Sequence, residues 1–237
     1  MSESSPHKRI LAFSDLHGDG FQAASALIDT HRPDWVITCG DMLPDFHQRP
    51  SNYRLKAQHE FWMDHRSLIT REGIVTTMIV GNHELPGFRY PRMDVLPAGF
   101  EGSVLRLEGV PRDFGPFSFV HGLPDTELEE EIQAGLSHVP DPIIYVSHAP
   151  PYGSCDRNFQ GDHIGHRPFF QHLNDRDWPQ ALVLCGHVHH SFGMEVVGET
   201  TILNVATGFA RIEFNKSHCM VHEMGCLVES GNSWNSP

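Results

Sequence analysis

The sequence predicts an α/β domain with a mainly parallel sheet, and three observations support this prediction. Short apolar runs bounded by turn residues recur along the chain, as is typical of buried strands. Segments whose apolar residues follow helical spacing separate the first of these runs. Strands that alternate with helices favour parallel pairing, with the helices on the faces of the sheet.

The first half of the chain shows this alternation most clearly. We expect strands at 9–13, 35–39 and 74–80. A helix at 20–30 is indicated because its apolar residues fall on one face, and residues 52–70 form the longest helical candidate.

The second half repeats the pattern and then becomes rich in strands. Strands are expected at 103–107, 117–120, 143–147 and 181–185, and helices at 125–136 and 167–174. Closely spaced strands at 192–197, 201–205, 209–214 and 218–224 suggest an antiparallel portion. Since no long linker divides the chain, we expect one domain over residues 8–228, followed by a polar tail at 229–237.

Composition limits the classes of partner. The 237 residues are enough for a sizeable single core. The formal net charge is −13, from 17 Lys+Arg against 30 Asp+Glu, so the chain repels nucleic-acid backbones and we expect no nucleic-acid partner. The polar start and the lack of a long apolar stretch predict a cytoplasmic protein with no membrane segment.

Histidine, not cysteine, is the abundant candidate metal ligand. The chain has 18 His and only five Cys, an odd number with no C-x-x-C pair. That pattern argues against a disulfide framework and against a thiolate zinc site.

A polar cluster follows each of five apolar runs. In an open α/β sheet, functional groups gather beyond the carboxyl ends of the strands, so we expect these clusters along a single edge. They are Asp15-Leu16-His17, Gly40-Asp41, Gly81-Asn82-His83-Glu84, His148 and Gly186-His187-Val188-His189.

The clusters combine donors that suit two metal ions. Asp-x-His places a carboxylate and an imidazole close enough to share one ion, and Gly lets the backbone bend beside it. Mixed His, Asp and Asn donors favour Mn, Fe, Zn or Co over Ca or a lone Mg, and Mn is our first choice. A carboxylate such as Asp41 could bridge two ions.

Two ions at about 3.5–4 Å from each other would suit hydrolysis of a phosphate ester, because they clamp the attacking and leaving oxygens. The leaving group also needs a proton. His83 is placed to donate it, because it directly follows the candidate ligand Asn82.

The ordered motifs D-x-H, G-D, G-N-H-E, H and G-H-x-H, from Asp15 to His189, resemble the calcineurin-like metallophosphoesterase superfamily. The resemblance implies a four-layered α/β/β/α sandwich with two mixed sheets. It implies a nucleophilic hydroxide that bridges the metals, with Asp41 as the bridging ligand. His83 would be the general acid, and both Asn82 and His83 would contact the phosphate. The implied ligands are Asp15, His17, Asp41 and His189 for the first metal, and Asp41, Asn82, His148 and His187 for the second.

One motif departs from the protein-phosphatase branch of that superfamily. Those phosphatases resemble G-D-x-V-D-R-G, in which an Asp orients the motif histidine and an Arg grips phosphate. Here Pro44 occupies the Asp position and no Arg follows. Asp45, one residue later, is an alternative, so the partner of His83 is left open.

The loop at 154–168 falls between two ligand motifs and is expected to border the substrate. The preceding segment, 149–153, resembles small phosphodiesterase-like members. Arg157, His163 and Arg167 are the candidate substrate contacts. His121 is interpreted as structural and His190 as a neighbour of the metal site.

The leading hypothesis is therefore a dinuclear metal-dependent phosphoesterase acting on a small phosphate ester. A diester is favoured, in line with the resemblance of residues 149–153 to small phosphodiesterase-like members. Little length lies outside the core to form a cap, and an open groove suits small or varied substrates. The alternatives are a phosphomonoesterase or protein phosphatase, and a binding scaffold without turnover. A metallo-β-lactamase-like hydrolase is disfavoured, because His-x-His-x-Asp-His is absent. The sequence leaves the oligomeric state open.

Overall fold

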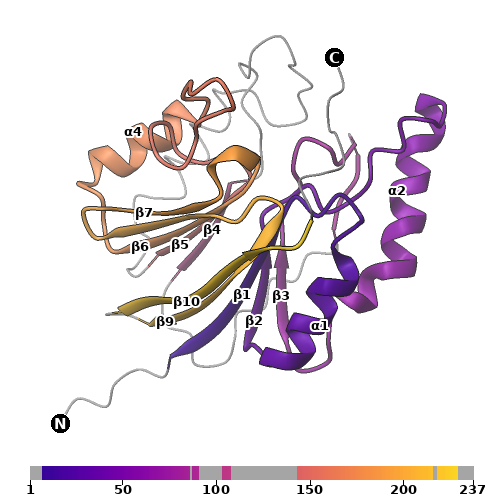
Figure 1. The fold of residues 1–237 in the computed structure, drawn as a ribbon, viewed down its shortest axis with the longest axis horizontal. Helices are drawn as coiled ribbons and strands as arrows, with labels where there is room; N and C mark the ends of the chain where they lie inside the picture. Colours follow the sequence, from indigo (N-terminus) through magenta and orange to yellow (C-terminus); the bar gives the residue numbers. More distant parts are fainter. Residues whose placement is uncertain (1–6, 86, 91–102, 108–142, 216–217, 229–237) are drawn as a thin grey trace.

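A computed structural model describes residues 7–85, 87–90, 103–107, 143–215 and 218–228. Within these ranges, two five-stranded sheets carry helices on their outer faces (Figure 1). The strand order is β10-β9-β1-β2-β3 in the first sheet and β4-β5-β6-β8-β7 in the second.

The first sheet is built around β1 (Lys8–Ser14), which is fully buried from Ile10 onward. β2 (Trp35–Thr38) and β3 (Val75–Met78) extend it in parallel. On the other side, β9 (Gly208–Asn215) pairs antiparallel with β1, and β10 (His218–Cys226) pairs antiparallel with β9. The first sheet is therefore mixed.

The second sheet is parallel except at one edge. β4 (Ser103–Leu107), β5 (Ile143–Ser147), β6 (Ala181–Cys185) and β8 (Thr200–Asn204) run parallel. The edge strand β7 (Gly193–Val197) pairs antiparallel with β8. The C-terminal strands predicted as an antiparallel portion thus divide between the two sheets, and β8 joins β6 in parallel.

Three hydrophobic clusters separate four layers. Alternate side chains of β1 point in opposite directions: Ile10 and Ala12 face the second sheet, whereas Leu11 and Phe13 face the helices. The first cluster joins the two sheets, and the second joins the first sheet to α1 (Phe21–His31) and α2 (Ser51–His65). The third joins the second sheet to α4 (Arg167–Asp175). This is the four-layered α/β/β/α sandwich.

One predicted helix was too long, and several predicted segments lie outside the described residues. The helix predicted at 52–70 ends at His65, and a short 3₁₀ turn, η1 (Arg66–Leu68), follows it. The strand at 117–120, the helix at 125–136, His121 and the tail at 229–237 lie outside the described residues. Among the helices that the structure describes, none has the length and apolarity needed to cross a bilayer.

Candidate metal centre

The predicted ligands follow strand ends of both sheets, which corrects the expectation of a single sheet edge. Asp15, Asp41 and Asn82 follow β1, β2 and β3 of the first sheet, whereas His148 and His187 follow β5 and β6 of the second. Because the two sheets face each other, the carboxyl ends of these strands meet across the interface. The Asp-x-His and Gly-His-x-His turns add His17 and His189 to the same site.

Hydrogen bonds between the two sheets hold the ligand turns together. His148 Nδ1 lies 2.7 Å from the carbonyl oxygen of Cys39, which fixes the ring and leaves Nε2 directed at the site. The backbone N–H of His187 donates to Asp15 Oδ2 over 2.9 Å. These contacts orient ligands in the way that outer partners do in metal sites.

Four ligand residues have a left-handed backbone. The φ angles are 55° at Asp15, 47° at His17, 51° at Asp41 and 67° at His187. Such angles are uncommon outside glycine and cost free energy, and they concentrate at functional sites. Here each one turns the chain sharply at the end of a strand, so that its side chain enters the site.

Glycines permit the close approach of these turns. A Cβ on Gly40 would lie 2.8 Å from His148 Nδ1, and one on Gly81 would lie 2.7 Å from Asp41 Cγ. A Cβ on Gly186 would lie 2.7 Å from Ser14 Cβ, next to Asp15. The glycines of the three motifs therefore leave space that the ligands of the neighbouring motif occupy.

The first candidate metal group consists of Asp15, His17 and His189, whose ligand atoms all lie within 4.8 Å of one another. Asp15 Oδ1 lies 3.1 Å from His189 Nε2, and the rings of His17 and His189 are 5.6 Å apart. Asp15 and His17 are buried, whereas the side chain of His189 is 32% exposed and opens the group to solvent.

The second group consists of Asp41, His148 and His187, again within 4.8 Å. His148 Nε2 lies 3.2 Å from Asp41 Oδ2 and 3.2 Å from His187 Nδ1. Asn82 Oδ1 lies 2.8 Å from each of these two ring nitrogens. Two imidazole nitrogens and two side-chain oxygens that converge on one point are a donor set suited to a divalent cation.

The pKa shifts keep Asp15 and Asp41 ionised and His187 neutral, which are the protonation states that metal ligands require. Burial would raise the pKa of Asp15 and Asp41, but nearby histidines outweigh it, so the pKa of Asp15 is about 2 and that of Asp41 lies well below its usual value. Burial and the charge of His148 lower the pKa of His187 to about 3. For His148, Asp41 and Asp15 outweigh burial and raise the pKa to about 9. A cation held by the carboxylates would supply the charge that this proton provides.

Asp45 is the partner of His83. His83 Nδ1 lies 2.5 Å from Asp45 Oδ1, and His83 Nε2 lies 3.9 Å from Asp41 Oδ2. These carboxylates outweigh burial and raise the pKa of His83 to about 10. Asp45 Oδ2 in turn lies 3.0 Å from Nε2 of the exposed His47. Asp45 thus takes the role of the Asp that the protein-phosphatase motif has at the position of Pro44.

Glu84 is a functional residue to which the sequence reasoning assigned no role. Its side chain is 2% exposed and accepts hydrogen bonds from four backbone N–H groups, at distances of 2.6–3.1 Å. The donors are the N–H groups of Gly81, Asp41, Met42 and Leu43. The hydroxyl of Tyr90 also donates to it over 2.9 Å. Glu84 therefore joins the turn that carries Asp41 to the turn that carries Asn82, and its place in G-N-H-E was the available signal.

The three predicted substrate contacts lie on or beside one loop. Arg157 is exposed and donates from Nη1 to the carbonyl oxygen of Gly161 over 2.5 Å. His163 Nδ1 lies 2.5 Å from Oδ1 of Asp156, a carboxylate that is 1% exposed. Arg167 places its guanidinium 3.7 Å from the ring centre of Tyr152. Asp156 Oδ2 also accepts hydrogen bonds from the backbone N–H groups of Gly153 and Gly165, each over 2.9 Å. No signal in the sequence indicated this anchoring role.

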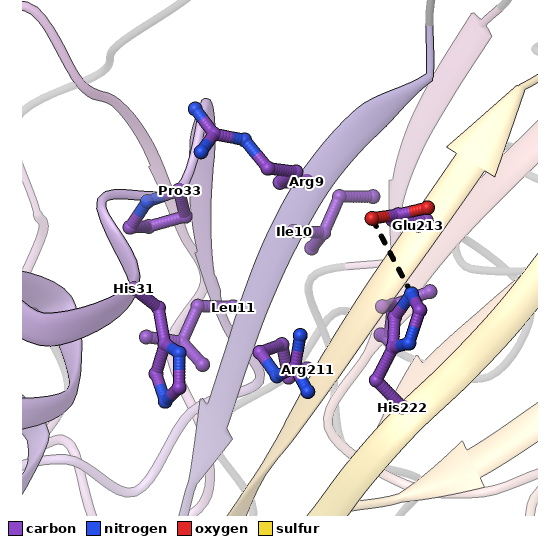
Figure 2. A pocket seen from close by; sticks show the side chains of 9 residues that line it. Arg9, Ile10, Leu11, His31, Pro33, Arg211, Glu213 and His222 are labelled. Carbon is purple, nitrogen blue, oxygen red and sulfur yellow. Dashed lines mark ion pairs between the residues drawn. The ribbon is translucent and has the colours of Figure 1, made fainter.

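A small cavity of about 40 Å³ lies near the start of β1 (Figure 2). Arg9, Arg211, His31 and His222 contribute to its lining, and His222 pairs with Glu213 at 3.4 Å. Arg9 pairs with Asp34 at 3.1 Å, so two of the basic side chains that line the cavity already have acidic partners. The cavity does not adjoin the candidate metal centre.

Comparisons with known proteins agree with this geometry. The model of the calcineurin-like phosphoesterase family matches residues 8–191. A dimetal phosphatase from Danio rerio has a similar structure, with a TM-score of 0.64 and 12% identity, over 91% of this chain and 98% of that one. The protein TT1561 of Thermus thermophilus has a TM-score of 0.59 and 17% identity, over 94% and 100%. The search of curated proteins found no match. Since the family model covers most of the chain, the protein belongs to the calcineurin-like phosphoesterase family.

Proposed function

We propose that the protein hydrolyses a small phosphodiester with the help of two divalent transition-metal ions. The observation that carries this proposal is the convergence of two ligand groups beside His83. Asp15, His17 and His189 form one group, and Asp41, His148 and His187 form the other. Membership of the family supports a metal-dependent phosphoester hydrolase.

Seven residues would hold the metals. We assign Asp15, His17 and His189 to the first ion, Asn82, His148 and His187 to the second, and Asp41 to both. Asp41 is suited to bridging, because it lies in the second group and its charge also acts on His17 of the first. The mixture of carboxylate, amide and imidazole donors favours Mn, Fe, Zn or Co, with Mn as our first choice. When bound, the ions supply a hydroxide nucleophile at neutral pH and neutralise charge on the phosphate.

His83 is the proposed general acid. Because Asp45 engages Nδ1, Nε2 is the atom from which a proton can pass to the leaving oxygen. As the nucleophile forms its bond to phosphorus and the bond to the leaving oxygen breaks, this proton neutralises the departing alkoxide. Asn82 and His83 would also contact the phosphate, and Arg157, His163 and Arg167 would contact the rest of the substrate.

Two features favour a diester over a monoester. A monoester dianion needs more positive charge than a diester monoanion, yet no Arg follows Asp41 in the second motif. The chain is also strongly acidic, with a formal net charge of −13. A monoesterase is therefore the second candidate.

The test measures hydrolysis of bis-p-nitrophenyl phosphate and p-nitrophenyl phosphate by metal-stripped protein reloaded with Mn. We expect faster turnover of the diester, and loss of both activities in Asp41→Asn. A preference for the monoester would reassign the protein as a phosphatase. Absence of turnover with metal bound would contradict the proposal and favour the scaffold hypothesis.

A further inference from the structure

Residues 157–163 form a tight hairpin that presents Phe159 to solvent. Arg157 and His163 pair as an isolated antiparallel bridge at its base. Within the turn, Asn158 Oδ1 accepts hydrogen bonds from the backbone N–H groups of Gln160 and Asp162, each over 2.9 Å. Phe159 is 74% exposed, the largest exposed fraction among the large hydrophobic side chains that the structure describes. The turn therefore holds an apolar ring in a defined and open position.

The hairpin is attached to the turn that carries a metal ligand. That turn is η3 (His189–Ser191), which begins at the ligand His189. Ser191 Oγ donates to the carbonyl oxygen of Arg157 over 2.8 Å. The rings of Phe159 and His190 lie 6.0 Å apart at an angle of 57°. Phe159 thus contacts the residue next to a metal ligand.

A second attachment fixes the start of the loop. The side-chain amide of the buried Asn204 donates to the carbonyl oxygens of Cys155 and Val188, over 3.0 and 2.9 Å. Val188 lies between the two ligands of the Gly-His-x-His motif. The hairpin and the ligand turn are therefore held as one unit, and little ordering entropy would be lost when a ligand binds to Phe159.

Single exposed apolar residues are common and need no explanation. Phe159 differs because it is held in a fixed turn and its aromatic neighbour, His190, directly follows the metal ligand His189. An exposed aromatic face favours another planar ring, through stacking and burial of apolar area.

We propose that Phe159 and His190 form an aromatic shelf at the rim of the metal centre, and that this shelf binds a planar aromatic group carried by the phosphoester substrate. The inference rests on the proposed function, since the metal centre must hold the phosphate end of the same molecule. A nucleobase and a simple aryl group share the required chemistry.

The test measures binding, and so does not depend on turnover. Phosphonates are titrated calorimetrically into the Mn-loaded protein at mildly acidic pH. Their carbon–phosphorus bond resists hydrolysis, and at that pH they are mainly monoanions, like the proposed diester. Methylphosphonate serves as the reference without a ring. 2-Phenylethylphosphonate and the methylene phosphonate analogue of adenosine monophosphate carry the two kinds of ring. We expect the ring compounds to bind about tenfold more tightly than methylphosphonate.

Single substitutions test whether Phe159 and His190 cause the tighter binding of the ring compounds. Phe159→Ala should remove most of it, His190→Ala should reduce it, and Phe159→Trp should retain it. Methylphosphonate affinity should stay unchanged in Phe159→Ala. Tyr53→Ala is the matched control, because Tyr53 is another exposed aromatic residue, on α2, at 55% exposure.

Equal affinity of the wild-type protein for all three compounds would overturn the shelf and leave the proposed function standing. A ring preference that survives in Phe159→Ala would overturn it as well. If methylphosphonate itself fails to bind, the proposed phosphate site fails and the shelf fails with it. Tighter binding of the adenosine compound would support a nucleobase as the ligand, and tighter binding of the phenylethyl compound would support an aryl group.

Discussion

The Nδ1 atom of His83 lies 2.5 Å from Oδ1 of Asp45. This contact directs Nε2 of His83 toward the metal ligands, where Nε2 lies 3.9 Å from Asp41 Oδ2. Gln58 supports the pair from α2, because its amide donates to the carbonyl oxygens of Pro44 and His83, over 3.2 and 2.7 Å. A carboxylate one residue later than in the protein-phosphatase motif therefore reaches the same histidine.

Replacing the carboxylate of Asp45 should slow turnover without removing the metals. We expect Asp45→Asn to lower kcat about 100-fold, because His83 would lose the group that orients it for proton transfer. The loss should be larger for a phenyl than for a p-nitrophenyl leaving group, since the poorer leaving group depends more on the proton. Steady-state kinetics with both esters check this.

Asp64→Asn, at an exposed position on α2, is the control for that variant and should behave as wild type. An equal loss for both leaving groups would contradict a role of Asp45 through the general acid.

The two ligand groups should differ in their response to single substitutions. We expect two ions per chain in the wild-type protein and about one in Asp15→Asn, because Asp15 belongs only to the first group. Asp41→Asn should weaken both sites. Metal content after dialysis, measured by plasma mass spectrometry, gives these numbers. Asp19→Asn, an exposed neighbour, should keep two ions, and two tightly held ions in Asp15→Asn would refute the assignment.

Removing the carboxylate of Glu84 should destabilise the metal-free fold. Glu84→Ala leaves four buried backbone N–H groups without their acceptor, and each lost partner costs about 1–3 kcal/mol, although such costs are not additive. We therefore expect the free energy of unfolding to fall by at least about 3 kcal/mol. Urea denaturation in the presence of a chelator measures it. Glu72→Ala, at an exposed site, is the control; a loss as small as in that control would disprove the anchoring role.

His166 should make the fold sensitive to acid. Burial lowers the pKa of His166 to about 4, so the folded protein keeps this ring neutral where the unfolded chain, with a pKa near 6.5, protonates it. Unfolding then takes up a proton between these two pH values. Stability should consequently fall as the pH decreases from about 6.5 to about 4, and this contribution should level off below that range.

His166→Asn tests this, because Asn cannot titrate and still suits the N-cap position that His166 occupies before α4. Unfolding free energies measured from pH 7 to 4 should show a smaller slope in His166→Asn than in the wild-type protein. An unchanged slope in His166→Asn would show that other groups dominate.

Much of the fold and of the candidate site could be predicted from local patterns. Runs such as 10–13 and 181–185 are strands because they are apolar, short and bounded by turn residues. Each ligand motif follows its run directly, so the positions of Asp15, His148 and His187 relative to their strands depend on a few neighbouring residues. The helix predicted at 52–70 was too long, because the chain tightens into a 3₁₀ turn at residues 66–68, and the spacing of apolar residues does not reveal that change.

Contacts between segments that are distant in the sequence were less predictable. The expectation of a single sheet edge was wrong, because strand patterns do not reveal which strands pair. The family resemblance alone indicated two sheets. Asp45 could not be assigned to His83, because the path of residues 42–46 depends on Glu84 and Gln58. The role of Asp156 depends likewise on the course of the loop at 153–165.

By itself, the sequence determined the strands, the order of the ligand motifs and the chemical character of the donors, because these depend on side-chain type and spacing along the chain. Only the tertiary structure decided that two sheets bring the motifs together, that Asp45 holds His83, and that Phe159 stands beside His190. The physical reason is that these relationships are distances between segments far apart in the chain, and packing of both sheets around their shared core sets them.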